Sequence, residues 1–299
     1  MASSPAPAGQ AAIRRPSGRD MADFPFILCA DDYGLSPAVS EGIREALAAG
    51  RINATGAMTN RPDWAAAAPL LRPHLGPAQA GVHLNLTAGA PLSPRPALAP
   101  DGRLPPIAFF LRARRLAPAL AAEVAAEIAA QFDAFEDALG RAPDFVDGHQ
   151  HVHALRCVRG LLLAEMERRG WAGRVWLRDS ADKPSRILAR RVETKKAMAL
   201  AWFAHGFAKE ARGRGFSLNE GFSGFSAFDP ARPYGADFTR YLRAPGPRHL
   251  IMCHPGHVDA ALAEVDPVTT TREAELAFLL SDAFPLALAR AGARLARWT

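Results

Sequence analysis

Short apolar runs alternate with longer helical patterns along most of this chain, and this alternation restricts the possible folds more than any other feature. We expect strands at 25–30, about 51–59 and 80–87, and further strands that begin near 144, 174 and 249. The longest helix is expected at 116–139, before Gly140. Strands separated by helices are typical of βα units around a parallel sheet. The sequence therefore predicts an α/β fold.

Two adjacent aspartates follow the first apolar run. The run FPFILCA ends directly at Asp31 and Asp32, and Ser36, Pro37 and Gly50 then mark the start and the end of a helix. An isolated pair of this kind is most often a solvated turn or a helix cap. Neighbouring side chains of an extended strand point to opposite faces. We therefore expect the strand to end within the pair, so that both carboxylates can serve one site.

The bulk composition is that of an ordinary globular protein. The chain has 299 residues, 49% of them apolar and 22% charged, and its net charge of +6 favours anionic partners. The cysteines Cys29, Cys157 and Cys253 lie far apart, which indicates neither a thiolate zinc site nor a disulfide framework. We expect residues 1–22 to be a flexible tail and residues 23–299 to be one domain. No run reaches about 18 uncharged apolar residues, so we expect a cytoplasmic protein, either soluble or peripheral to a membrane.

Polar side chains stand where the apolar runs end. They are Asp31, Asp32, His83, Asp147, His149, Arg178 and His254, each at or just past the carboxyl end of an expected strand. In an α/β barrel these ends share one face, and that face carries the active site. His83 alone would more often be a core histidine, but the group together predicts a common site.

The segment DGHQHVH places polar side chains at every second position. If the strand persists, Asp147, His149, His151 and His153 all point to one side. Burying four such groups is costly unless they bind something, and carboxylates and neutral imidazoles are usual ligands of divalent metals. We therefore predict a metal site, and the alternative is a surface histidine tract.

Four motifs carry a resemblance to a known family. ADDYGLS, GVHLNLT, DGHQHVH and MCHPG occur in this order, and together they resemble the YdjC-like carbohydrate deacetylase family over about 25–290. The segment TREAELAFLLSDAF is similar to the sequences of one branch of this family, the branch associated with hopanoid biosynthesis. The resemblance implies an irregular (β/α) barrel of the glycoside hydrolase/deacetylase type, with its active site at the carboxyl ends of the parallel strands. It also implies a metal-dependent hydrolase that removes acetate from an N-acetylglucosamine unit.

The same resemblance assigns roles to individual residues. It implies that Asp32, His83 and His149 bind one divalent metal, for which zinc, magnesium and cobalt are all suitable. Asp31 would be the general base and His254 the general acid.

Four further residues are expected around this centre. The spacing of His149 and His153 is similar to that of polysaccharide deacetylases, so His153 remains a rival third ligand, and His151 is expected nearby. Asp147 would orient a histidine through its other ring nitrogen. Arg178 would either support the site or hold the sugar or the acetate product.

The segment 186–214 bears on the substrate. It carries eight basic and two acidic residues, with Leu200, Trp202, Phe203 and Phe207 between them. Such a pattern fits a basic amphipathic helix at a bilayer surface, or a solvent-facing helix packed on the barrel. The stretch 106–116, PIAFFLRARRL, has the same pattern of aromatic residues next to arginines.

We therefore favour deacetylation of the N-acetylglucosaminyl head group of a hopanoid lipid over deacetylation of soluble chito-oligosaccharides. A non-catalytic module that binds membrane or nucleic acid is the alternative of another class. Nucleic acid is not expected as a partner, because a nucleic-acid groove has no need of clustered aspartates and histidines. A metal-dependent phosphoesterase is also conceivable on chemical grounds.

Overall fold

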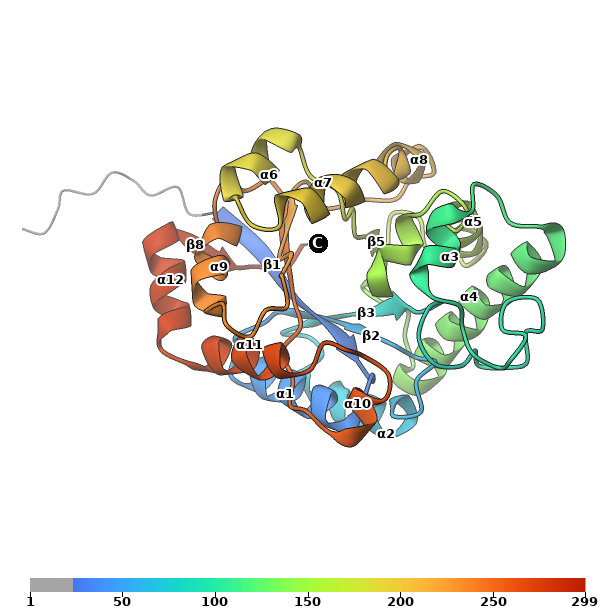
Figure 1. The fold of residues 1–299 in the computed structure, drawn as a ribbon, viewed down its shortest axis with the longest axis horizontal. Coiled ribbons are helices and arrows are strands. Elements are labelled where there is room, and N and C mark those ends of the chain that lie inside the picture. The colour runs from blue at the N-terminus through green and yellow to red at the C-terminus, as the bar shows by residue number, and fades with distance from the viewer. Residues whose placement is uncertain (1–23, 299) are drawn as a thin grey trace, which may run out of the picture.

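The computed structural model describes residues 24–298, so the tail expected at 1–22 lies outside the described residues. Its centre is a curved sheet of parallel strands in the order β5-β4-β3-β2-β1-β7-β6, with β8 beside the start of β1 (Figure 1). An isolated bridge between Leu177 and Leu218 links β5 to the segment before β6. The strands are β1 (Phe24–Tyr33), β2 (Ala54–Ala57), β3 (Gln79–Leu84), β4 (Phe145–Gly148), β5 (Trp176–Leu177), β6 (Phe222–Ser223), β7 (His249–Cys253) and β8 (Ala293–Leu295). This is the predicted irregular α/β barrel.

Helices surround the sheet (Figure 1). They are α1 (Pro37–Ala48), α2 (Trp64–Leu71), α3 (Ile107–Arg112), α4 (Pro118–Leu139), α5 (Arg159–Arg168), α6 (Pro184–Arg190), α7 (Thr194–Phe203), α8 (Phe207–Gly213), α9 (Tyr234–Tyr241), α10 (Ala260–Ala263), α11 (Thr270–Leu280) and α12 (Ala283–Ala291), with short 3-10 helices η1 (Arg72–His74) and η2 (His149–Ala154). Between 24 and 298, no helix combines the length and the apolar character that crossing a bilayer requires.

The helix ends follow the predicted signals. The Ser36 side chain accepts a hydrogen bond from the Val39 N–H at the start of α1, and Gly140 ends α4 in the left-handed conformation with φ 71°. Both caps satisfy backbone groups that helix ends leave without partners.

Two strands are shorter than predicted because asparagine side chains end the regular pairing. Before β2, the Asn53 side chain accepts a hydrogen bond from the Leu28 N–H at 2.8 Å. After β3, the Asn85 side chain accepts from the N–H groups of Thr87 and Ala88 at 3.1 and 3.0 Å. Such an Asx turn folds the chain away from the sheet.

The segment 186–214 forms helices α6, α7 and α8 in place of one long helix. Arg191 and Gly206 interrupt it with positive φ values of 55° and 85°. Ile187 and Phe207 are buried, so much of its apolar side packs on the barrel. Leu188 and Trp202 are exceptions, with 56% and 73% of their surfaces exposed.

Candidate active site

The expected polar residues gather at the carboxyl end of the sheet. Asp31 and Asp32 end the central strand β1, His83 lies near the end of β3, and Asp147 lies in β4. His254 directly follows β7. With His149, the first four of these lie close together because neighbouring parallel strands end at the same edge.

The end of β1 differs from the prediction. The strand does not end within the aspartate pair but continues to Tyr33, with a register shift against β2 between Ala30 and Tyr33. Asp32 adopts a positive φ of 74°, a conformation that aspartate tolerates better than most residues. This irregularity turns the two neighbouring carboxylates toward different partners within one site.

Asp32 faces two histidines. Its Oδ1 lies 3.3 Å from Nε2 of His83 and 3.0 Å from Nδ1 of His149. Among the described residues, these three side chains form a group whose potential ligand atoms lie within 4.8 Å of one another. One carboxylate and two imidazoles suit a divalent metal, so the donor set fits the metal that the resemblance implies.

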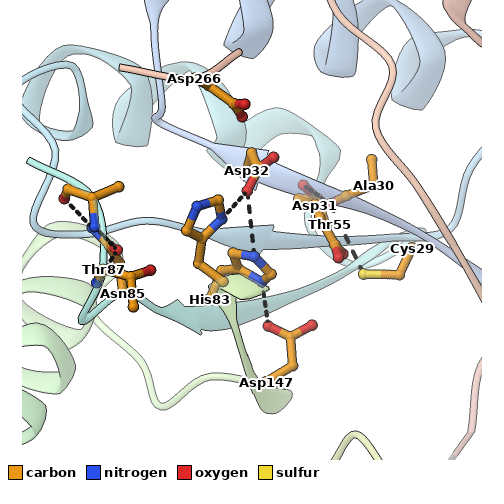
Figure 2. Close-up of polar contacts among 12 residues, drawn as sticks. Cys29, Ala30, Asp31, Asp32, Thr55, His83, Asn85, Thr87, Asp147 and Asp266 are labelled. Carbon is orange, nitrogen blue, oxygen red and sulfur yellow. Dashed lines mark hydrogen bonds and ion pairs between the residues drawn. The ribbon is translucent and has the colours of Figure 1, made fainter. Parts of the chain in front are cut away.

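Asp147 supports the same group from the opposite side of the imidazole. Its Oδ1 lies 2.7 Å from Nδ1 of His83, whose Nε2 faces Asp32 (Figure 2). Gly56 on β2 leaves room for this pair, since a Cβ there would lie 3.1 Å from His83 and 3.2 Å from Asp147. Burial lowers the pKa of His83, but Asp147 and Asp31 outweigh burial and raise it to about 10. The carboxylates around His83 therefore favour positive charge at this position.

Asp31 faces an arginine. Arg178 donates two hydrogen bonds of 2.6 Å to its carboxylate and also contacts Asp147. Burial favours a raised pKa, but the guanidinium outweighs it and holds the pKa of Asp31 well below its usual range. Arg178 is 0% exposed. It lies behind the carboxylates, outside the residues that line the cavity of the site, and its contact with a substrate stays a prediction.

The strand after Asp147 does not persist, so the prediction of four side chains on one face is wrong. β4 ends at Gly148, and Gln150 and His151 have positive φ values of 51° and 59° within η2. Only His149 of the three histidines joins Asp32 and His83. His153 is buried, and its Nε2 lies 2.9 Å from the Arg178 carbonyl.

His151 lies in the same cavity as Asp31, Asp32 and His83, as expected, and its ring packs against the rings of Phe222 and Phe225 at centroid distances of 5.8 and 5.9 Å. The structure therefore gives no support to His153 as a ligand. The assignment of His149 stays a prediction.

His254 stands across the site at the start of the loop after β7. Its ring meets the edge of Phe228 at a centroid distance of 5.4 Å. Burial lowers the pKa of His254 to about 4, although the carboxylates of Asp32 and Asp31 act in the other direction. Burial therefore disfavours the charged form of this ring.

These residues open into one cavity of about 360 Å³. Asp31, Asp32, His83, His149, His151 and His254 are among the residues that line its polar part, and the apolar wall includes Ile107, Leu111, Leu155, Leu200, Phe203, Phe225, Phe228, Met252 and Val268. The cavity can thus hold a polar group at the reactive centre and apolar surface beside it.

Sequence reasoning missed Asp266, Arg272 and Glu275. The Arg272 guanidinium lies 2.7 Å from Oδ2 of Asp32, and Glu275 accepts a hydrogen bond from the His254 N–H. The available signal was their spacing in TREAELAFLL, which places Arg272 and Glu275 on the apolar face of α11 with Leu276 and Leu279.

Comparison with known proteins identifies the family. The model of the family described as "YdjC-like protein" matches residues 25–290. The chain belongs to this family. A human carbohydrate deacetylase is 32% identical over 199 residues, which are 60% of this chain and 59% of that protein, so the match spans less than two thirds of the human protein. A chitooligosaccharide deacetylase of Klebsiella pneumoniae is 30% identical over 90% of this chain and 96% of its own length.

A solved structure agrees with the fold. A protein of Enterococcus faecalis superposes with a TM-score of 0.69 and 25% identity, covering 92% of this chain and 98% of its own. The predictions of an irregular α/β barrel and of the YdjC-like family are therefore confirmed.

Proposed function

We propose that this YdjC-like chain is a hydrolase of amide bonds, a metal-dependent N-deacetylase of an acetylated amino sugar. The names of its relatives support a carbohydrate deacetylase. The observation that carries the proposal is the joining of Asp32, His83 and His149 in one group, beside Asp31 and His254 in the same cavity. A non-catalytic binding module would have no use for this arrangement.

Asp32, His83 and His149 would hold one divalent metal. When bound, such an ion lowers the pKa of water and polarises the acetyl carbonyl. Asp147 fixes the His83 ring so that Nε2 faces Asp32, as second hydrogen-bond partners of metal-binding histidines usually do.

Asp31 and His254 would move the protons. Arg178 keeps Asp31 ionised, so this carboxylate is available to accept the proton of the attacking water. His254 would donate a proton to the departing nitrogen, since an amine anion does not leave unaided. Burial lowers the pKa of His254, so the ring, once it is charged, donates its proton more readily than an exposed imidazolium does.

The substrate is, in our proposal, the N-acetylglucosaminyl head group of a hopanoid lipid. The resemblance to the hopanoid-associated branch suggests it, and the apolar wall of the cavity supports it. Leu111, Leu155 and Phe203 line both this cavity and a neighbouring groove of about 740 Å³ that reaches Trp202. A lipid portion could follow this groove while the sugar lies at the metal centre. The relatives named as chitooligosaccharide deacetylases favour the soluble alternative.

The groove also suggests where the chain would approach a membrane from the cytoplasmic side. Trp202 in α7 and Phe109 and Leu111 in α3 are exposed. Arg114 and Arg156 line the same groove, and basic side chains beside exposed aromatic ones are typical of surfaces that bind anionic bilayers.

Mass spectrometry of acetyl loss tests the function. Purified chain is incubated with N-acetylglucosaminyl hopanoid in vesicles and, separately, with diacetylchitobiose, each with and without a chelator. We expect chelator-sensitive acetate release and faster turnover of the lipid. No release from either substrate by metal-loaded protein would refute the deacetylase assignment, and turnover of diacetylchitobiose alone would favour the soluble substrate.

Liposome flotation tests the membrane contact. We expect wild-type chain to float with anionic vesicles at low salt and less at high salt. Trp202→Glu should abolish flotation. Leu286→Glu is the matched control, because Leu286 is 55% exposed on α12, away from the groove. Equal flotation of both variants would refute the assigned surface.

A further inference from the structure

Helix α11 carries two ionisable side chains on its buried face. Arg272 is 0% exposed and Glu275 is 2% exposed, and residues three apart lie on one side of a helix. Buried charges are costly unless they are paired and hydrogen-bonded. The partners of these two side chains therefore indicate why they are present.

Arg272 holds the oxygen of Asp32 that the histidines do not face. Its Nη2 lies 2.7 Å from Oδ2 of Asp32, whereas Oδ1 faces His83 and His149. The same Nη2 lies 2.7 Å from Oδ2 of Asp266. Figure 2 shows Asp266 and His83 on opposite sides of Asp32. Because the guanidinium fixes one oxygen, it sets the rotation of the Asp32 carboxylate and leaves the other oxygen directed at the histidines.

Helix α11 also holds the turn that carries His254. The Glu275 Oε2 accepts a hydrogen bond of 2.7 Å from the His254 N–H. Pro255 has no N–H to donate, and the next donor, the Gly256 N–H, bonds to the Arg272 carbonyl at 3.3 Å. Both N–H groups of the His-Pro-Gly turn are thus bound to one turn of α11.

We propose that Arg272 and Glu275 are positioning residues for the two parts of the reaction centre, the metal site and the proton donor. Arg272 orients Asp32 toward the metal, and Glu275 places His254. This inference rests on the proposed function, because it assigns the metal to Asp32 and proton donation to His254. It predicts that the two residues affect different measurements.

Calorimetric titration of metal-free protein with Zn²⁺, repeated with Co²⁺, tests Arg272. Outer partners of metal ligands typically contribute a factor of about 10 to 100 in metal affinity, so Arg272→Met should weaken binding by at least about tenfold. If this variant does not fold, Arg272→Lys serves instead, since lysine keeps the charge but loses the planar guanidinium. Glu273→Gln is the control, because Glu273 is exposed on the same helix and should bind as wild type does.

Steady-state kinetics tests Glu275. Glu275→Leu removes the acceptor for the His254 N–H and should lower kcat by about 10- to 100-fold, while the Zn²⁺ affinity stays within about twofold of wild type. Glu275→Gln keeps a carbonyl oxygen that can accept this hydrogen bond. Its kcat should therefore be at least about tenfold higher than that of Glu275→Leu.

The outcomes separate this inference from the function beneath it. Wild-type chain that binds no divalent metal and releases no acetate would refute both. Suppose instead that the wild-type chain binds metal and releases acetate. The positioning roles alone would then be refuted if folded Arg272→Met had wild-type metal affinity, or if Glu275→Leu had wild-type kcat. Equal effects of Glu275→Leu and Glu275→Gln would also refute the hydrogen-bond role of Glu275.

Discussion

The Arg178 guanidinium is buried between two carboxylates, and replacing it tests how the site is held together. Arg178→Met removes the two hydrogen bonds of 2.6 Å to Asp31 and the contact with Asp147. Asp31 then remains as a buried carboxylate without its cation. Removing one partner of a buried ion pair costs about 3–5 kcal/mol. For a domain of this size, about 1 kcal/mol shifts the melting temperature by about 2–4 °C, so we expect a decrease of about 6–20 °C.

Differential scanning calorimetry at neutral pH measures this change. Arg178→Lys keeps the charge and should lose about half as much. Arg168→Met is the control, because Arg168 pairs with Glu165 on the surface, where its side chain is 66% exposed, and such pairs contribute less than about 1 kcal/mol. Arg178→Met with an unchanged melting temperature and a raised KM would contradict the view that Arg178 stabilises the buried carboxylates, and would indicate a substrate contact.

Three further measurements test the site and its stability. Asp31→Asn should bind metal but lose about 100- to 10,000-fold in turnover, whereas His83→Ala should lose both metal binding and activity. Near-normal turnover of Asp31→Asn would exclude Asp31 as the general base. Dialysis against a chelator should abolish acetate release, and one equivalent of divalent metal should restore it; full activity after complete removal of metal would exclude metal dependence. Burial, aided by Arg190, lowers the pKa of His249 to about 3. His249 is therefore protonated in the unfolded chain below about pH 6.5, but it stays neutral in the folded chain down to about pH 3. The free energy of unfolding should therefore fall between pH 6.5 and 3, and His249→Asn should reduce that slope by up to about 1.4 kcal/mol per pH unit in urea titrations; an unchanged slope would contradict the assignment.

The gathering of polar residues at one edge of the sheet was predictable from the sequence, because it depends on short local patterns. An apolar run followed by a polar residue marks the end of a buried strand, and parallel strands bring such ends to one edge. This local pattern is sufficient to place Asp31, Asp32, His83 and Asp147 together. It fails after Gly148, where Gln150 and His151 adopt positive φ values. Neither residue signals this conformation, so the period of two could not be recognised as ending there.

The supporting residues were harder to predict because their partners lie far away in the sequence. Arg272 and Asp32 are separated by 240 positions, and Glu275 and His254 by 21. A charged residue on the apolar face of a helix indicates that it has a buried partner, but it does not identify that partner. The sequence can thus mark α11 as unusual, and only the fold connects it to the reaction centre.

The aspartate pair shows why the local backbone matters to the chemistry. In a regular strand, Asp31 and Asp32 would point to opposite faces of the sheet, and one of them would be lost to the site. The register shift with φ 74° at Asp32 allows both to face the cavity while each meets a different cation, Arg178 for Asp31 and Arg272 for Asp32. Irregular strand ends of this kind are frequent beside active sites, where they redirect a side chain. Two neighbouring carboxylates can then differ in role, since Arg178 fixes both oxygens of Asp31 and Arg272 leaves one oxygen of Asp32 free for the histidines and for the proposed metal.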